Sequence, residues 1–166
     1  MRPDDRIIFV NTFSKNWSMT GWRIGWVTVH PELQQVFENL VQYSTSGVAP
    51  FMQRGAVAAL DEGDAFVVAT IERARQARDI VCSALARTGR VRFAAPPGAF
   101  YLFFQIEGVS NSRDAAIRII DETNVGLAPG SAFEAPDEGW FRLCFNRRLD
   151  LIEEASQRLA TWIAAK

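Results

Sequence analysis

The chain has 166 residues, 48% of them hydrophobic, and its 18 basic and 19 acidic side chains leave a net charge of -1. This length and composition are typical of a folded protein with one domain, or one domain and part of another, and not of a disordered chain. The balanced charge argues against nucleic-acid binding. The lack of a long apolar stretch, and of signal-peptide character in residues 1–6, predicts a cytoplasmic protein.

Two apolar segments near the N-terminus flank a short polar turn. Residues 6–13 are rich in β-branched and aromatic side chains, which predicts a buried strand. Residues 22–29 predict a second strand, which can pair with the first as a hairpin. Such pairing would bring Thr12, Lys15 and Arg23 together at one end of the sheet.

Lys15 stands out because the chain otherwise uses arginine for positive charge. Of its 18 basic residues, 16 are Arg, and the only other lysine is the C-terminal Lys166. Arginine keeps its proton in a protein, whereas a desolvated lysine can attack a carbonyl and form an imine. A lone lysine is more often a solvated surface charge, so the role of Lys15 depends on its surroundings.

The residues around Lys15 form a motif with many specified positions. Ser14-Lys15 is followed, after five residues, by Gly21-x-Arg23-x-Gly25. The motif resembles the lysine signature of class I aminotransferases of the aspartate aminotransferase fold, which depend on pyridoxal phosphate. It is especially similar to a bacterial branch with Met-Thr-Gly-Trp-Arg-Ile-Gly after the lysine. The resemblance covers essentially the whole chain and continues, in family order, through residues 97–101, 129–133 and 142–146.

This resemblance implies transfer of an amino group from an amino acid to a 2-oxo acid. Lys15 would hold pyridoxal phosphate as an imine and, once displaced by the incoming amine, would move the proton between the substrate α-carbon and the cofactor. Arg23, as a two-pronged donor, and Thr12, through its hydroxyl, would anchor the cofactor phosphate. Taken without the motif, Arg23 would be interpreted as half of a structural ion pair.

Three helices are expected in the middle of the chain, at residues 31–41, at 51–60 and in a longer segment from Asp64. In the family that this sequence resembles, a long helix at this point joins the large domain to the small one. We therefore assign residues 1–75 to the C-terminal part of the large cofactor-binding domain and residues 76–166 to the small C-terminal α+β domain.

The C-terminal part alternates between strand and helix signals. Asn111 and its serine neighbours offer caps for one helix, and Asp150 is expected to cap the last one. We expect strands at 91–93, 100–106, 125–128 and 140–145, and helices at 112–123 and 151–163.

Arg142 lies in an alternating segment, on the face opposite to Phe141, Leu143 and Phe145. An arginine among apolar neighbours needs an anionic partner. The partner is either a structural carboxylate or the α-carboxylate of a substrate, which a guanidinium grips with two parallel hydrogen bonds. Position-for-position similarity to the carboxylate-binding arginine of the family favours the substrate.

The implied fold class is α/β, as the C-terminal part of a pyridoxal-phosphate-dependent transferase fold. Members of the family are much longer than this chain. In them the missing N-terminal part supplies an acidic residue for the pyridine nitrogen, a ring that stacks on the cofactor and further phosphate donors. The chain is therefore interpreted as a fragment, a truncated gene product or one subunit of a split enzyme, weakly active at best by itself.

Other functions remain open. The chain can be a non-catalytic remnant that acts through dimerisation or ligand binding, or its parent can use pyridoxal phosphate for decarboxylation or elimination. A regulator of the same ancestry is disfavoured, because there is no DNA-binding segment and both Lys15 and Arg142 are present. Unpaired strand edges predict association, either as a dimer or with the missing N-terminal half.

The remaining reactive residues suggest structural roles. Cys82 and Cys144 have no CxxC spacing, which predicts free thiols in the core of a protein from a reducing compartment. His30, the only histidine, directly precedes Pro31 at an expected helix start, which predicts a turn residue. One histidine cannot make a His-rich metal site, so no metal is expected.

Overall fold

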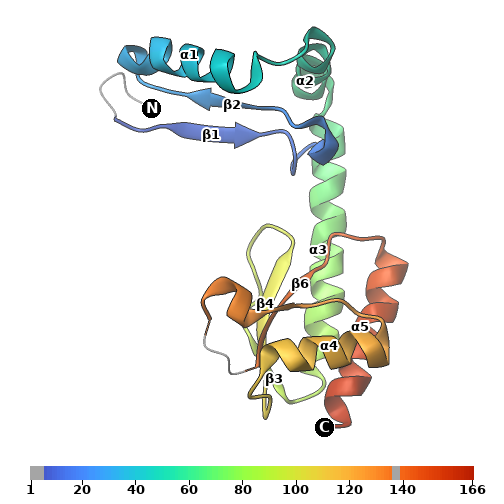
Figure 1. Ribbon diagram of the computed structural model, residues 1–166. Helices are drawn as coiled ribbons and strands as arrows, with labels where there is room; N and C mark the ends of the chain where they lie inside the picture. Colours follow the sequence, from blue (N-terminus) through green and yellow to red (C-terminus); the bar gives the residue numbers. More distant parts are fainter. Residues whose placement is uncertain (1–5, 136–138) are drawn as a thin grey trace. The chain divides into compact units, whose positions relative to one another are not determined.

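The computed structural model describes residues 6–135 and 139–166. The chain forms two compact units, Met1–Thr70 and Ile71–Lys166, called here the N-terminal and the C-terminal unit (Figure 1). Their division falls inside the long helix α3 (Asp64–Ala86), while the assignment of 1–75 and 76–166 to two domains stays a prediction.

The predicted lack of a signal peptide rests mostly on residues 1–5, which lie outside the described part. Within the residues that the structure describes, no helix is both long and apolar enough to cross a membrane. The cytoplasmic location stays a prediction.

The N-terminal unit is built on a two-stranded antiparallel hairpin of β1 (Phe9–Thr12) and β2 (Gly25–Thr28). The pairing ends at Thr12 and Gly25, where the strands come very close: a Cβ on Gly25 would lie 2.3 Å from the Asn11 carbonyl oxygen. Both strands are shorter than predicted. β2 begins late because a 3₁₀ turn at Thr20–Trp22 and a left-handed Arg23 precede it.

Two helices follow the hairpin, and Figure 1 shows α1 running alongside it. They are α1 (Gln34–Thr45), preceded by a 3₁₀ turn at Pro31–Leu33, and α2 (Pro50–Glu62). Proline begins both the turn and α2, as suits a first-turn position with no hydrogen-bond partner for its nitrogen.

The core of the N-terminal unit is small. The prediction that residues 6–13 form a buried strand is wrong for this chain, because all four residues of β1 are exposed. Their apolar composition fits a covered strand, but the described residues of the unit leave β1 exposed. The buried hydrophobic cluster consists of Phe13, Met19, Ile24 and Ala56.

The C-terminal unit contains a four-stranded antiparallel sheet in the order β3-β4-β6-β5. The predicted strand at 125–128 is displaced, because only Ala128 and Pro129 pair with β6. The strands are β3 (Val91–Phe93), β4 (Tyr101–Ile106), β5 (Ala128–Pro129) and β6 (Trp140–Cys144).

One face of this sheet forms a core with α3, α4 (Ser112–Thr123) and α5 (Leu149–Ala164). The predicted alternation of β6 is confirmed, since Phe141, Leu143 and Phe145 are buried. The largest fully buried hydrophobic side chains of the unit are Phe104, Phe141, Phe145, Leu85, Leu102, Ile119, Leu159, Ile163 and Val81.

The cysteines and the helix caps correct some sequence expectations. Cys82 is half-buried against the core, but Cys144 is exposed on the opposite face of β6, so only Cys82 is a core thiol. Asn111 caps α4, as predicted, by accepting a hydrogen bond from the Asp114 amide. Asp150 does not cap α5; it lies in the first turn, and a hydrogen bond from Arg148 lowers its pKa.

Candidate functional site

The segment around Lys15 is a tight turn anchored on both sides by buried apolar residues. The Phe13 amide donates to the Ile24 carbonyl at 3.2 Å, and the Met19 amide donates to the Phe13 carbonyl at 3.4 Å. Phe13, Met19 and Ile24 are all buried, whereas Lys15 is exposed between them. The hydrogen bonds and buried residues therefore hold the backbone of the turn in place, while Lys15 itself is exposed.

Two hydroxyl groups lie just before the lysine. The Ser14 amide donates to Thr12 Oγ1 at 3.1 Å, and the Thr12 hydroxyl lies 2.9 Å from Ser14 Oγ and 3.4 Å from the Ile24 carbonyl oxygen. Ser14 is 8% exposed, so its hydroxyl is held inside the turn. The sequence assigned no role to Ser14, although its place directly before the lysine was a usable signal.

Arg23 follows the turn in a left-handed backbone conformation, with φ of 52°, which is uncommon for a residue with a side chain. Its Nη1 donates to the Thr20 carbonyl at 3.1 Å. Within residues 6–135 and 139–166, no carboxylate forms an ion pair with Arg23, so the alternative of a structural ion pair finds no partner there.

Thr12, Lys15 and Arg23 lie at the same end of the hairpin, because Thr12 closes the ladder opposite Gly25 and Phe13 bonds to the residue after Arg23. A hydroxyl and a guanidinium suit a phosphate, and a primary amine suits a carbonyl carbon. The chemistry of these three side chains therefore fits a ligand that carries both a phosphate and a carbonyl group. The individual roles stay predictions.

Arg142 belongs to the C-terminal unit, where it contacts two aromatic rings. Its guanidinium carbon lies 4.4 Å from the centroid of the Tyr101 ring and 4.2 Å from that of Phe133. In the described part of the chain no carboxylate pairs with it. Cation–π contacts of this kind contribute about 0.5–2 kcal/mol each and leave the positive charge unneutralised. Within the described residues, the neighbours of Arg142 are thus two rings, and its role stays a prediction.

The sequence did not identify Tyr101 and Phe133 as neighbours of Arg142. Tyr101 lies on β4, whose Phe103 is directly opposite Arg142, so strand register could have located it. Phe133 ends a 3₁₀ turn at Gly130–Phe133, and its contact with β6 depends on the path of that turn. Its only sequence signal was its place in the 129–133 motif.

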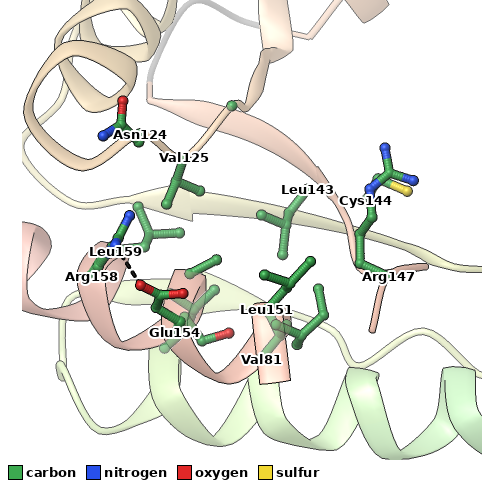
Figure 2. Close-up of a pocket in the computed structure, with 15 residues that line it drawn as sticks. Val81, Asn124, Val125, Leu143, Cys144, Arg147, Leu151, Glu154, Arg158 and Leu159 are labelled. Carbon is green, nitrogen blue, oxygen red and sulfur yellow. Dashed lines mark hydrogen bonds and ion pairs between the residues drawn. The ribbon is translucent and has the colours of Figure 1, made fainter. Parts of the chain in front are cut away.

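The C-terminal unit also has a groove (Figure 2). Its volume is about 440 Å³, and its floor is formed by apolar side chains of α3, β6 and α5, such as Val81, Leu143 and Leu159. Figure 2 shows the Glu154–Arg158 ion pair at one end and Arg147 at the other. None of the four residues predicted from sequence lines this groove, so it adds nothing to the candidate site.

Comparison with known proteins links the chain to one family. The profile of the family described as aminotransferase class I and II matches residues 1–159. The chain is 33% identical over 162 residues to an aspartate aminotransferase of Thermotoga maritima, covering 98% of this chain and 41% of that protein. It is 32% identical to an LL-diaminopimelate aminotransferase of Nitratidesulfovibrio vulgaris, covering 94% of this chain and 40% of that protein.

Solved structures agree with the sequence comparison. A crystal structure of an aminotransferase from Mycobacterium tuberculosis matches 96% of this chain and 42% of its own, with a TM-score of 0.88 and 30% identity. The Thermotoga maritima aspartate aminotransferase structure matches with a TM-score of 0.83, over 95% of this chain and 40% of its own. The chain has the predicted fold class, a partial α/β transferase fold, and spans about two fifths of the length of these relatives.

Proposed function

The chain belongs to the class I and II aminotransferases, since their profile matches residues 1–159, and on this basis we propose that it carries essential residues of a pyridoxal-phosphate-dependent enzyme. The proposed reaction transfers an amino group from an amino acid to a 2-oxo acid. The named relatives, which are aminotransferases, support this reaction over decarboxylation or elimination by the same cofactor.

The arrangement of Thr12, Lys15 and Arg23 at one end of the hairpin is the observation that carries the proposal. Pyridoxal phosphate, when bound, supplies an electron-accepting ring that stabilises charge at the substrate α-carbon. We assign Lys15 Nζ to binding the cofactor carbonyl carbon and to moving the proton at the α-carbon. Arg23 and the Thr12 hydroxyl bind the phosphate.

Arg142 is assigned to the carboxylate of the substrate. Its two ring neighbours leave its charge uncompensated within the described residues, so a carboxylate ligand meets a full positive charge. A planar guanidinium can bind such a group with two parallel hydrogen bonds. This task orients the substrate and requires no proton transfer by Arg142.

The proposed activity belongs to a protein larger than this chain. The chain spans 41% of the Thermotoga maritima relative, and the N-terminal unit has many exposed apolar residues, with Val10 79% and Phe51 69% exposed. We propose that this surface is covered in the working enzyme by the parts of the fold that the relatives have and this chain lacks. The chain by itself is then weakly active.

Light scattering tests the proposed covering. We expect the isolated chain to self-associate, because uncovered apolar surface and two open strand edges favour it. A monodisperse monomer at high concentration would contradict the proposal that this surface requires a covering partner. A stable dimer would identify a second copy as the covering partner.

Borohydride trapping tests the assignment of Lys15. The purified chain is incubated with pyridoxal phosphate and reduced, and the labelled residue is located by peptide mass spectrometry. We expect one adduct per chain on Lys15 and none on Lys166, which lies 3.7 Å from Glu122 and 5.0 Å from the Trp162 ring centroid. Equal labelling of both lysines, or no adduct, would refute a selective cofactor site in this chain.

A matched variant completes this test. Lys15→Arg keeps the charge of the turn but cannot form the bond to the cofactor. We expect it to abolish trapping while the circular dichroism spectrum and thermal midpoint stay unchanged. Persistent labelling of Lys15→Arg at another site would show that the adduct is nonspecific.

A further inference from the structure

Among the described residues, Arg142 has aromatic neighbours where some arginines of the same unit have a carboxylate. Arg148 donates to both oxygens of Asp150, at 3.1 and 2.6 Å, and Arg158 pairs with Glu154. Arg142 instead has the rings of Tyr101 and Phe133 within 4.4 Å of its guanidinium carbon. A ring holds a cation without neutralising it, whereas a carboxylate partner would compete with an anionic ligand.

We propose that Tyr101 and Phe133 are positioning residues that hold the guanidinium of Arg142 ready for a carboxylate ligand. This inference rests on the proposed role of Arg142 in substrate binding. The guanidinium carbon lies over both rings, and a ring face has no lone-pair acceptor that competes with a carboxylate for the N–H donors. The rings thus restrict the side chain and leave its donors available.

Phe133 is held in place by a chain of aromatic contacts. Its ring is perpendicular to that of Phe103, with centroids 6.4 Å apart, and Phe103 stacks on Trp140 at 5.0 Å with an interplanar angle of 12°. Phe103 and Trp140 belong to the paired strands β4 and β6. The ring of Phe133 is therefore supported from the sheet that also carries Arg142.

The turn that carries Phe133 packs directly on β6. Gly130 begins it and is buried, and a Cβ there would lie 2.5 Å from Trp140 Cβ and 2.9 Å from the Trp140 carbonyl oxygen. A side chain at residue 130 would push the turn away from the strand. This close approach sets the height of Phe133 above the sheet.

Tyr101 is held in place by a separate set of contacts. It begins β4, pairs with Cys144 in β6, and its ring lies 4.7 Å from that of Phe100. The Phe100 carbonyl accepts a hydrogen bond from the Phe145 amide at 3.0 Å, which fixes the backbone just before Tyr101. The two rings therefore come from separately anchored segments, and their separate removal can be compared.

The test measures the mobility of Arg142 directly in the full 166-residue chain. The arginine Nε–Hε signals are recorded by NMR, and the signal missing in Arg142→Lys identifies Arg142. We expect Tyr101→Leu and Phe133→Leu each to speed rotation about the Nε–Cζ bond by about fivefold and to remove the ring-current shift, as the loss of one cation–π contact predicts.

Conservative variants serve as matched controls. Tyr101→Phe and Phe133→Tyr keep a ring at each place, and we expect rotation rates within about twofold of the wild type. Amide signals of β4 and β6 verify that each variant keeps its sheet. Unchanged mobility of Arg142 in both leucine variants would overturn the proposal, as would equal effects of leucine and aromatic substitutions.

A second titration separates this proposal from the proposed function. 2-Oxoglutarate is added while the Arg142 signal is followed, and we expect a saturable shift whose midpoint rises about fivefold in the leucine variants. If the wild-type signal does not respond, the carboxylate role of Arg142 fails, and with it the purpose proposed for the rings. If it responds equally in the leucine variants, the rings do not position Arg142.

Discussion

The two units differ in how far they cover their own apolar residues. Among the described residues, the buried hydrophobic cluster of the N-terminal unit has four members, whereas that of the C-terminal unit has 18. Both units have regular strands and helices, so local propensity and pairing suffice to shape the elements of each. Because burial of apolar surface is the main stabilising term in folding, we expect the N-terminal unit to be much the less stable.

The largest expected effect of this difference is on the rates of amide hydrogen exchange. We expect the amides of β1 and β2 to exchange at least about a hundredfold faster than those of β4 and β6, because local opening exposes little additional apolar surface in the N-terminal unit. The measurement is native-state exchange followed by NMR or mass spectrometry. Equal protection of the two sheets would show that the small core is sufficient.

The same contrast explains what could be predicted from sequence. Helical spacing and an N-cap located α4 correctly, and period-two alternation identified the buried face of β6. Residues 6–13 predicted a buried strand because their side chains are suited to one. Burial, however, is a property of what lies around a strand, and sequence composition cannot show that the cover is absent.

The errors in the C-terminal unit have local causes. Val125 and Leu127 are buried, as in a strand, but ladder pairing begins only at Ala128. Asp150 has a side chain typical of a helix cap, but Arg148 engages both of its oxygens. In both cases the residue type suggested an element or a cap one or more positions away from where the backbone has it.

The candidate site was predictable to the extent that it depends on strand pairing. A hairpin across a short turn brings Thr12 and Arg23 to the same end, and this geometry is present. The surroundings of Arg142 were not predictable, because Phe133 reaches it from a separate turn. Pairing register follows from alternation, whereas the path of a loop depends on packing such as that of Gly130 on Trp140.

Truncation of one leucine in each unit sharpens the comparison. Leu102 is fully buried on β4, and Leu40 is 56% exposed on α1. We expect Leu102→Ala to lower the free energy of unfolding of the C-terminal unit by about 2–5 kcal/mol, through lost burial and the cavity left behind. At concentrations low enough for the chain to be monomeric, Leu40→Ala should change that of the N-terminal unit by less than about 0.5 kcal/mol, because the side chain then contacts water and alanine favours helix.

Denaturant unfolding followed by signals from each unit measures both changes. Leu151→Ala is a control inside the C-terminal unit, since Leu151 is 48% exposed on α5. A cost for Leu40→Ala comparable to that of Leu102→Ala would mean that α1 is covered in solution, for example by self-association, and light scattering of the same sample would then detect the partner.

The smallest expected effect is a difference in reactivity between two cysteines, one half-buried and one exposed. Cys82 on α3 is half-buried against the core, and burial raises the pKa of its thiol, partly offset by the positive charge of Arg78. Cys144, at the end of β6, is exposed. Because the thiolate is the reactive form, a raised pKa and limited access both slow the reaction of Cys82.

We expect iodoacetamide at pH 8 to label Cys144 on the order of tenfold faster than Cys82 in the folded chain. Raising the pH should increase labelling of Cys82 by increasing its thiolate fraction, and unfolding should make the two rates similar. Cys144→Ser supplies the control, since it leaves Cys82 as the only cysteine. Faster labelling of Cys82 in the native chain would show that the contact between α3 and the sheet opens readily, and the C-terminal core would then be less well covered than its burial indicates.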